Sequence, residues 1–166
     1  QHLDSDMPPC VAEVMTSLPI AGLHQEYELS RLFLASYAGS MDTFNAYRKE
    51  VERFIQWCWL VAKKPVQGVD RHDIREYLLF ADAPPKNWIA VKSCARFVYQ
   101  DGLRVHNKDW RPFVAKITKS QSRQGQDVDI KHFQLSNNAR AAMMAGLSTY
   151  FTFLQQEQYV EVNPVQ

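Results

Sequence analysis

The sequence predicts an all-α domain, a compact bundle of four to five helices with an irregular N-terminal arm. Three observations lead to this class. The chain has 166 residues, enough for one globular domain. Its hydrophobic fraction of 46% and charged fraction of 22% are those of an ordinary folded protein. Apolar residues recur at helical spacing in several segments, and no longer period of about 20–50 residues repeats, which excludes a solenoid.

The first part of the chain divides into an arm and a short helix. Residues 1–22 contain three prolines and little hydrophobic periodicity, which predicts an irregular arm. Between Gln25 and Tyr37 the apolar residues recur at three- and four-residue spacing. That spacing predicts an amphipathic helix with one buried face.

The clearest helix follows Ser40. The Ser40 hydroxyl is suited to cap the amides of the first turn, and Asp42 lies where the helix dipole favours an acid. Lys63-Lys64-Pro65 closes the helix with cations in its last turn. One apolar stripe marks the buried face of this helix: Phe44, Tyr47, Val51, Phe54, Ile55 and Cys58.

The next helix begins at a predicted capping box. Asp70 is the N-cap candidate, and Asp73 stands three residues later, where its carboxylate can return to the N-cap amide. Pro84-Pro85 ends this helix, because proline lacks the amide that the helical ladder needs.

The last helix is predicted from about Asn138 to Glu157. Ser136 or Asn137 is placed to cap it. Taken over all these helices, the helical period predicts the core residues: Tyr47, Phe54, Trp57, Tyr77, Leu147, Phe151 and Leu154.

The segment between these helices is ambiguous. In residues 86–110 the spacing of Trp88 and Val91 suits a helix, but Arg96–Tyr99 followed by Asp101-Gly102 suits a strand and a turn. Both interpretations stay open from the sequence. Residues 118–131 are polar and predict a flexible loop.

The charges are unevenly placed along the chain. The formal net charge is only +1, which taken alone argues against a nucleic-acid binder. Residues 1–30, however, carry five acids and no Lys or Arg, whereas residues 84–123 carry nine cations and two acids. The basic stretch is interleaved with aromatic residues, which fits a phosphate-binding strip; the alternative is a solvated face above core aromatics.

Several function classes are not indicated. Cys10, Cys58 and Cys94 lie far apart and predict reduced thiols in a cytoplasmic protein. The five histidines do not cluster with them, so no metal site is expected. No apolar run approaches the ~20 residues of a bilayer span, and no glycine-rich phosphate loop is present. We therefore expect no cofactor, no membrane association and no small-molecule substrate.

Six short patterns, taken in order, resemble one protein family. They are Ser40-x-x-Thr43-x-x-Ala46-Tyr47-Arg48, Asp73-Ile74-x-x-Tyr77-Leu78-x-Phe80, Pro84-Pro85-x-x-Trp88, Asp109-Trp110-Arg111-Pro112-Phe113, Leu135-Ser136-x-x-Ala139-Arg140-x-Ala142 and Tyr159-x-x-x-Asn163-Pro164. This series resembles the N-terminal SAM-like, or core-binding, domain of phage-integrase-type tyrosine recombinases. The resemblance departs from the family over residues 114–134, which are longer and more polar than the expected link.

The resemblance implies an orthogonal helical domain over residues 26–164, preceded by an arm over residues 1–25. Such a domain clamps one face of a recombination half-site in double-stranded DNA and contacts other recombinase protomers there. The family's catalytic domain, with its Arg, His-x-x-Arg and Tyr nucleophile, would begin after Asn163-Pro164 and is absent from this chain. The implied function is therefore non-catalytic DNA binding for integration or recombination, in the cytoplasm and on the nucleoid.

The resemblance and the charge pattern together give a set of candidate DNA contacts. Helix starts offer amides and a positive dipole end to phosphates, and the cations extend that surface. The candidate residues are Ser40, Thr43, Arg48, Lys92, Arg96, Arg111, Lys116, Lys119, Ser136, Asn138 and Arg140.

No active site is expected within the chain itself. His72 and Arg75 have the His-x-x-Arg spacing, but they fall in the first turn of a short helix and predict a solvated turn. Ser136 is interpreted as a helix cap, because no histidine is placed to activate it. The alternative function is a helical protein–protein interaction or regulatory domain that uses the acidic arm and exposed aromatic residues.

Overall fold

The computed structural model describes residues 7–115, 119–127, 130 and 133–166. Within them the chain forms six α-helices, three shorter helices and four short strands. The α-helices are α1 (Pro9–Ser17), α2 (Leu23–Ala35), α3 (Met41–Gln56), α4 (Arg71–Asp82), α5 (Lys119–Arg123) and α6 (Asn137–Gln156). The shorter helices are η1 (Trp57–Ala62), η2 (Val66–Gly68) and η3 (Lys86–Trp88), and the strands are β1 (Ile89–Ala90), β2 (Phe97–Gln100), β3 (Leu103–His106) and β4 (Phe113–Val114).

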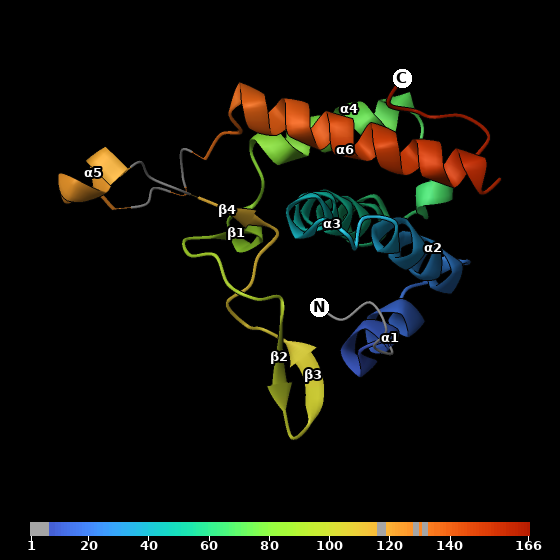
Figure 1. Cartoon of the computed structure of the whole chain (residues 1–166), viewed down its shortest axis with the longest axis horizontal. Helices are drawn as coiled ribbons and strands as arrows, with labels where there is room; N and C mark the ends of the chain where they lie inside the picture. The colour runs from blue at the N-terminus through green and yellow to red at the C-terminus, as the bar shows by residue number, and fades with distance from the viewer. Residues whose placement is uncertain (1–6, 116–118, 128–129, 131–132) are drawn as a thin grey trace.

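The predicted all-α class is wrong, because the described chain is a mixed α/β structure. The strands form two small sheets: β1 pairs in parallel with β4, and β2 pairs antiparallel with β3. In Figure 1 the β2–β3 hairpin extends from the main helical cluster beside α1, whereas β1 and β4 contribute Ile89 and Phe113 to the buried core.

Helix α3 is the central element. Figure 1 shows it nearly end-on, with α6 and α4 on one side and α1 and the hairpin on the other. Its contact with α6 is close, since a Cβ added at Gly146 would lie 3.2 Å from Glu50 Cγ. The Phe54 and Phe151 rings meet edge to face across the same contact, with their centroids 5.6 Å apart.

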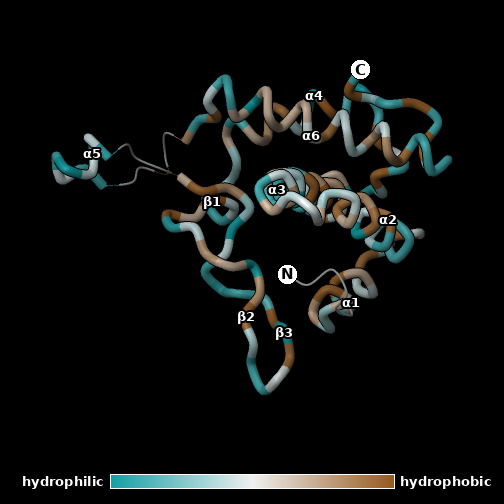
Figure 2. Tube along the Cα trace, viewed as in Figure 1, coloured by the Kyte–Doolittle hydropathy of each residue, from teal (hydrophilic) through white to brown (hydrophobic). Residues whose placement is uncertain are grey.

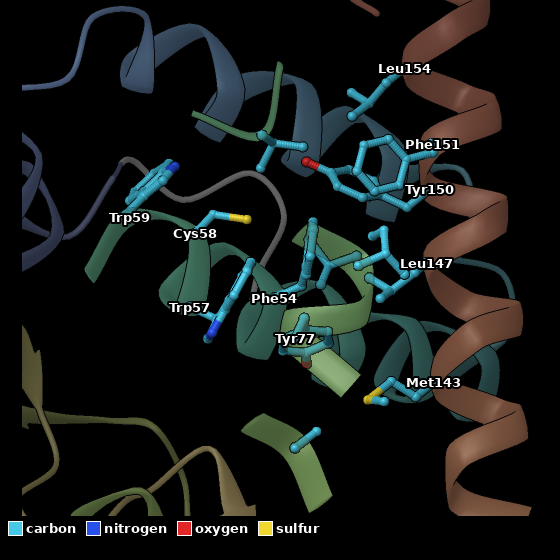
Figure 3. Close-up of a cluster of buried hydrophobic side chains, with 14 of the residues drawn as sticks. Phe54, Trp57, Cys58, Trp59, Tyr77, Met143, Leu147, Tyr150, Phe151 and Leu154 are labelled. Atoms are coloured by element: carbon cyan, nitrogen blue, oxygen red, sulfur yellow. The ribbon is translucent and has the colours of Figure 1, made fainter. Parts of the chain in front are cut away.

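The core predicted by helical period is confirmed, except that Tyr47 is only half-buried. Figure 3 shows this cluster, in which α3, η1, α4 and α6 contribute side chains that point toward one another. The labelled residues are Phe54, Trp57, Cys58, Trp59, Tyr77, Met143, Leu147, Tyr150, Phe151 and Leu154.

Helix α3 continues as a turn of π-helix, η1, which the sequence did not predict. The wider turn buries three consecutive residues, Trp57, Cys58 and Trp59. Lys63 ends it in a left-handed conformation, with φ of 57°, and the Lys64 amide donates to the Cys58 carbonyl at 3.0 Å. The extra residue per turn directs Trp59 toward α2 while Trp57 stays against α4.

Two of the three predicted helix caps are confirmed. Asp70 and Asp73 form the full capping box of α4, and the Ser136 hydroxyl accepts from the Ala139 amide at 3.0 Å. Ser40 occupies the N-cap position of α3 but makes no capping hydrogen bond. Its hydroxyl instead donates to the Thr43 hydroxyl at 3.1 Å.

The predicted irregular arm is wrong over the residues of α1. Pro8 and Pro9 precede the first hydrogen-bonded turn, where proline has no amide to lose, so they start the helix instead of preventing it. Val11 is buried, and the Cys10 thiol donates to the Arg104 carbonyl of β3 at 3.7 Å. The helix therefore packs along the hairpin.

The open question over residues 86–110 resolves as strands and a turn. Asp101 and Gly102 have φ of 53° and 78°, the two positive values that a tight antiparallel hairpin needs. The predicted loop over 118–131 is wrong at α5, a short polar helix that Figure 2 colours as largely hydrophilic. Among the described residues no helix is long and apolar enough to cross a membrane.

Candidate nucleic-acid interface

Five cations surround a hollow of about 180 Å³ on one flank of α3. We call it the basic hollow. Its cationic residues are Arg48, Lys49, Arg53, Lys92 and Arg111. Asn45 and Trp110 also line it, and Glu52 is its carboxylate.

Two local arrangements bring these cations together. On α3, Arg48 and Lys49 lie one helical turn before Glu52 and Arg53, so the four side chains share a face. Lys92 follows β1 by two residues, and Arg111 precedes β4 by two residues. The two residues flank opposite ends of the short parallel β1–β4 ladder, and both line the hollow against α3.

Arg53 and Arg111 are held in the wall by backbone carbonyls. Arg53 Nε donates to the Pro112 carbonyl at 2.6 Å, and the guanidinium lies 4.6 Å from the centre of the Phe113 ring. Arg111 Nη1 donates to the carbonyls of Lys108 and Trp110 at 2.6 and 2.7 Å. Both guanidinium groups are thus positioned before any ligand arrives.

Arg96 is held by contacts within the protein. Its Nη1 lies 3.3 Å from Glu52 Oε1, and the guanidinium sits between the rings of Phe97 and Trp110, at 5.0 and 5.2 Å from their centres. The side chain is only 22% exposed. Arg96 therefore fastens the hairpin to α3, and it balances the carboxylate of the basic hollow.

Glu50 lies beneath two cations of the basic hollow. Its carboxylate is 3.9 Å from Lys49 Nζ and 3.8 Å from Arg53 Nη1, and its residue is buried against α6. Burial raises the pKa of Glu50, while Arg53 and Lys49 act in the opposite direction. This acid reduces the positive potential of the hollow from inside the protein.

The N-terminus of α6 forms a second polar region. Ser136 caps the helix, Asn138 is exposed, and both carboxylate oxygens of Asp82 accept from Arg140 Nη2. Arg140 thus ties α6 to the end of α4. Its side chain remains 42% exposed, so the ion pair still borders solvent.

The remaining predicted contacts lie elsewhere. Ser40 and Thr43 are bonded to each other at the start of α3. Lys119 is exposed on α5, which Figure 1 shows projecting from the body, and Lys116 lies outside the described residues.

The structure thus brings together only part of the predicted set. Arg48, Lys92 and Arg111 line the basic hollow, with Arg96 bordering it through Glu52. Prediction missed Lys49 and Arg53 of the same hollow. Their signal was present in the sequence, because both share the polar face of α3 with Arg48.

The other chemistry weighed from the sequence gives no competing site. His72 is 75% exposed beside Glu76, and Arg75 is also exposed. Within the described ranges no group of three or more His, Cys, Asp or Glu is placed to hold a metal ion. Comparison of the chain with protein-family models, curated proteins and solved structures finds no match.

Proposed function

We propose that this chain is the non-catalytic DNA-binding domain of a site-specific tyrosine recombinase. It holds double-stranded DNA for integration or recombination by a separate catalytic domain. One observation carries the proposal: five cations surround one hollow whose carboxylate, Glu52, is already paired with Arg96. Such a concentration of positive charge favours a polyanion.

The geometry supports contact with phosphates more than with bases. Lys49 and Lys92 are exposed at the rim and can approach a phosphate as flexible point charges. Arg53 and Arg111 are fixed by their carbonyl partners, so a phosphate would meet guanidinium groups that lose little freedom. Contacts of this type position a protein on a duplex and carry little sequence information.

The test is a titration with duplex DNA, starting at low salt. We expect weak binding whose logarithmic affinity falls steeply and linearly with the logarithm of the salt concentration. Lys49→Gln and Lys92→Gln should each reduce that slope by about 0.9, the value for one lost phosphate contact. Lys63→Gln removes the same charge from an exposed site at the far end of η1 and serves as the control.

Two results would overturn this proposal. One is the absence of binding even when salt is lowered to about 20 mM, where phosphate contacts are strongest. The other is an equal effect of Lys63→Gln and Lys92→Gln, which would show that only net charge matters.

A protein partner is the second candidate, and one observation favours it. The hairpin exposes Val98, Tyr99 and Leu103, with Tyr99 74% exposed. Of the five acids in residues 1–30, Glu26 is fully buried and does not contribute to such a surface. Solution mass with and without DNA separates the candidates: association without DNA that Tyr99→Ser abolishes favours the protein partner, whereas association only on DNA fits protomer contacts of a recombinase.

A further inference from the structure

A second hollow, of about 280 Å³, lies on the other flank of α3. Residues of α1, α2 and the β2–β3 hairpin line it together with α3; Figure 1 shows how these elements are arranged. Its walls are mainly apolar and include Val11, Val14, Leu34, Val51, Ile55 and Phe97. We call it the apolar pocket. Its volume is just below the ~300–1,000 Å³ typical of ligand sites.

Two buried donors in this pocket make no hydrogen bond within the described structure. They are Gln56 Nε2 and Arg96 Nε, and both residues line the pocket. A buried donor without an acceptor costs about 1–3 kcal/mol, so it requires an explanation. The Nη1 atom of Arg96 is engaged with Glu52, which leaves its Nε hydrogen for a separate acceptor.

The charge around the pocket is positive. Four arginines line it, against one glutamate, Glu52. Burial lowers the pKa of His106 and raises that of Tyr27, so two further lining groups lie in a poorly hydrated setting. Electrostatic attraction in such a setting is stronger than in bulk water.

We propose that the apolar pocket binds a small amphiphilic carboxylic acid. The aliphatic chain occupies the space between α1, α2 and α3, and the carboxylate accepts hydrogen bonds from Gln56 Nε2 and Arg96 Nε. The chain length that fits is short, roughly eight to ten carbons for a pocket of this size. This proposal does not depend on DNA binding, because the site and its ligand are different.

The experiment uses decanoate, with decanol as the neutral probe of equal chain length. Methyl signals of Val11, Val14 and Leu34 in ¹³C-resolved NMR spectra report occupancy, and those of Leu79, exposed on α4, serve as the internal control. We expect saturable shifts of the pocket methyls with decanoate and at least tenfold weaker binding of decanol, since a charge-assisted hydrogen bond is lost.

The variant Gln56→Met distinguishes the loss of a hydrogen bond to the carboxylate from a change in the packing of the pocket. It should weaken decanoate binding about tenfold while leaving decanol unchanged, and the free protein should become no less stable, because an unsatisfied donor is removed. Gln25→Met, at an exposed position of α2, is the matched control and should change neither affinity.

Three outcomes would overturn the proposal. Pocket methyls that do not shift at millimolar decanoate show that the pocket takes no such chain. Equal affinities for decanoate and decanol show that no carboxylate site exists. Equal effects of Gln56→Met and Gln25→Met show that Gln56 does not donate to the carboxylate. Each can occur whether or not the basic hollow binds DNA.

Discussion

Glu26 and Glu50 are both buried glutamates, but the regions around them are built differently. The Glu26 carboxylate accepts three hydrogen bonds, from Trp59 Nε1, the Gln67 amide and the Tyr159 hydroxyl, at 2.7–3.0 Å. The Glu50 carboxylate lies 3.8–3.9 Å from the cations of Arg53 and Lys49, and its Oε2 makes no hydrogen bond within the described structure.

Glu26 is therefore a structural carboxylate, whereas Glu50 is a carboxylate placed beside the basic hollow. Glu26 joins α2, η1, η2 and the segment after α6, which the chain order keeps far apart. Glu50 joins no distant segments by hydrogen bonds, and its carboxylate borders Lys49 and Arg53 of the basic hollow. The same residue type is therefore used once for cohesion and once for electrostatic adjustment.

The largest effect is expected at Glu26. Glu26→Ala leaves two buried donors and one partly buried donor without an acceptor and should lower the free energy of unfolding by about 4 kcal/mol in urea titrations. Glu26→Gln keeps an acceptor oxygen and should cost about half as much. Exposed Glu28 on the same helix provides the control variant Glu28→Gln, and a loss at Glu26→Ala no larger than the control's would remove the structural role.

Gly146→Ala tests the contact that buries Glu50. The added Cβ would meet Glu50 Cγ at 3.2 Å and Glu50 Cβ at 3.3 Å, and Glu50 Cβ cannot rotate away. The added methyl group should force α3 and α6 apart. The cost of this displacement should exceed the gain in helix propensity, so the free energy of unfolding should fall by about 1 kcal/mol. In a Glu50→Ala background the loss should shrink; an undiminished loss would show that Glu50 is not the obstacle.

Glu50→Gln tests the charge, and the expected effect on stability is smaller again. Burial raises the pKa of Glu50 above its ordinary value of 4.5, so the folded state holds this proton more tightly than the unfolded state does. Its ionisation therefore removes stability as the pH rises from about that value, until the raised pKa is passed. In urea titrations across this pH range, the free energy of unfolding should vary less with pH for Glu50→Gln than for the unmodified protein. An unchanged pH dependence would show that Glu50 does not have a raised pKa.

The smallest effect is on the proposed DNA affinity. Glu50→Gln removes a negative charge beneath Lys49 and Arg53, so duplex DNA should bind roughly twofold more tightly at low salt. Glu26→Gln, which touches neither cation, should leave the affinity unchanged in the same titration. Equal gains from the two variants would mean that the distance to the hollow is irrelevant.

Much of the helical part could be predicted from the sequence. The hydrophobic period located α2, α3, α4 and α6, and the Asp70–Asp73 spacing gave the capping box. These features depend on residues within one or two turns of each other, which is the range that a linear pattern records. Helix α1 was not predicted, because residues 1–22 contain three prolines and little hydrophobic periodicity, although the first turn of a helix tolerates proline.

The site could be predicted only in part, because its geometry depends on distant pairings. Lys92 and Arg111 line the same hollow and flank the β1–β4 ladder, whose strands are two residues each and too short to give a periodic signal. Arg96 was grouped with the DNA contacts because it is a cation in a basic stretch. Its partner Glu52 lies on α3, and a count of charges along the sequence does not show which cations are already paired with an acid.

Arg48 and Glu52 line both the basic hollow and the apolar pocket. The two cavities on either flank of α3 thus share part of a wall, and any ligand that moves either side chain in one cavity alters the free energy of binding in the other. Thermodynamic linkage makes this effect reciprocal. Occupancy of one cavity should therefore be measurable as a change of affinity in the neighbouring cavity along α3.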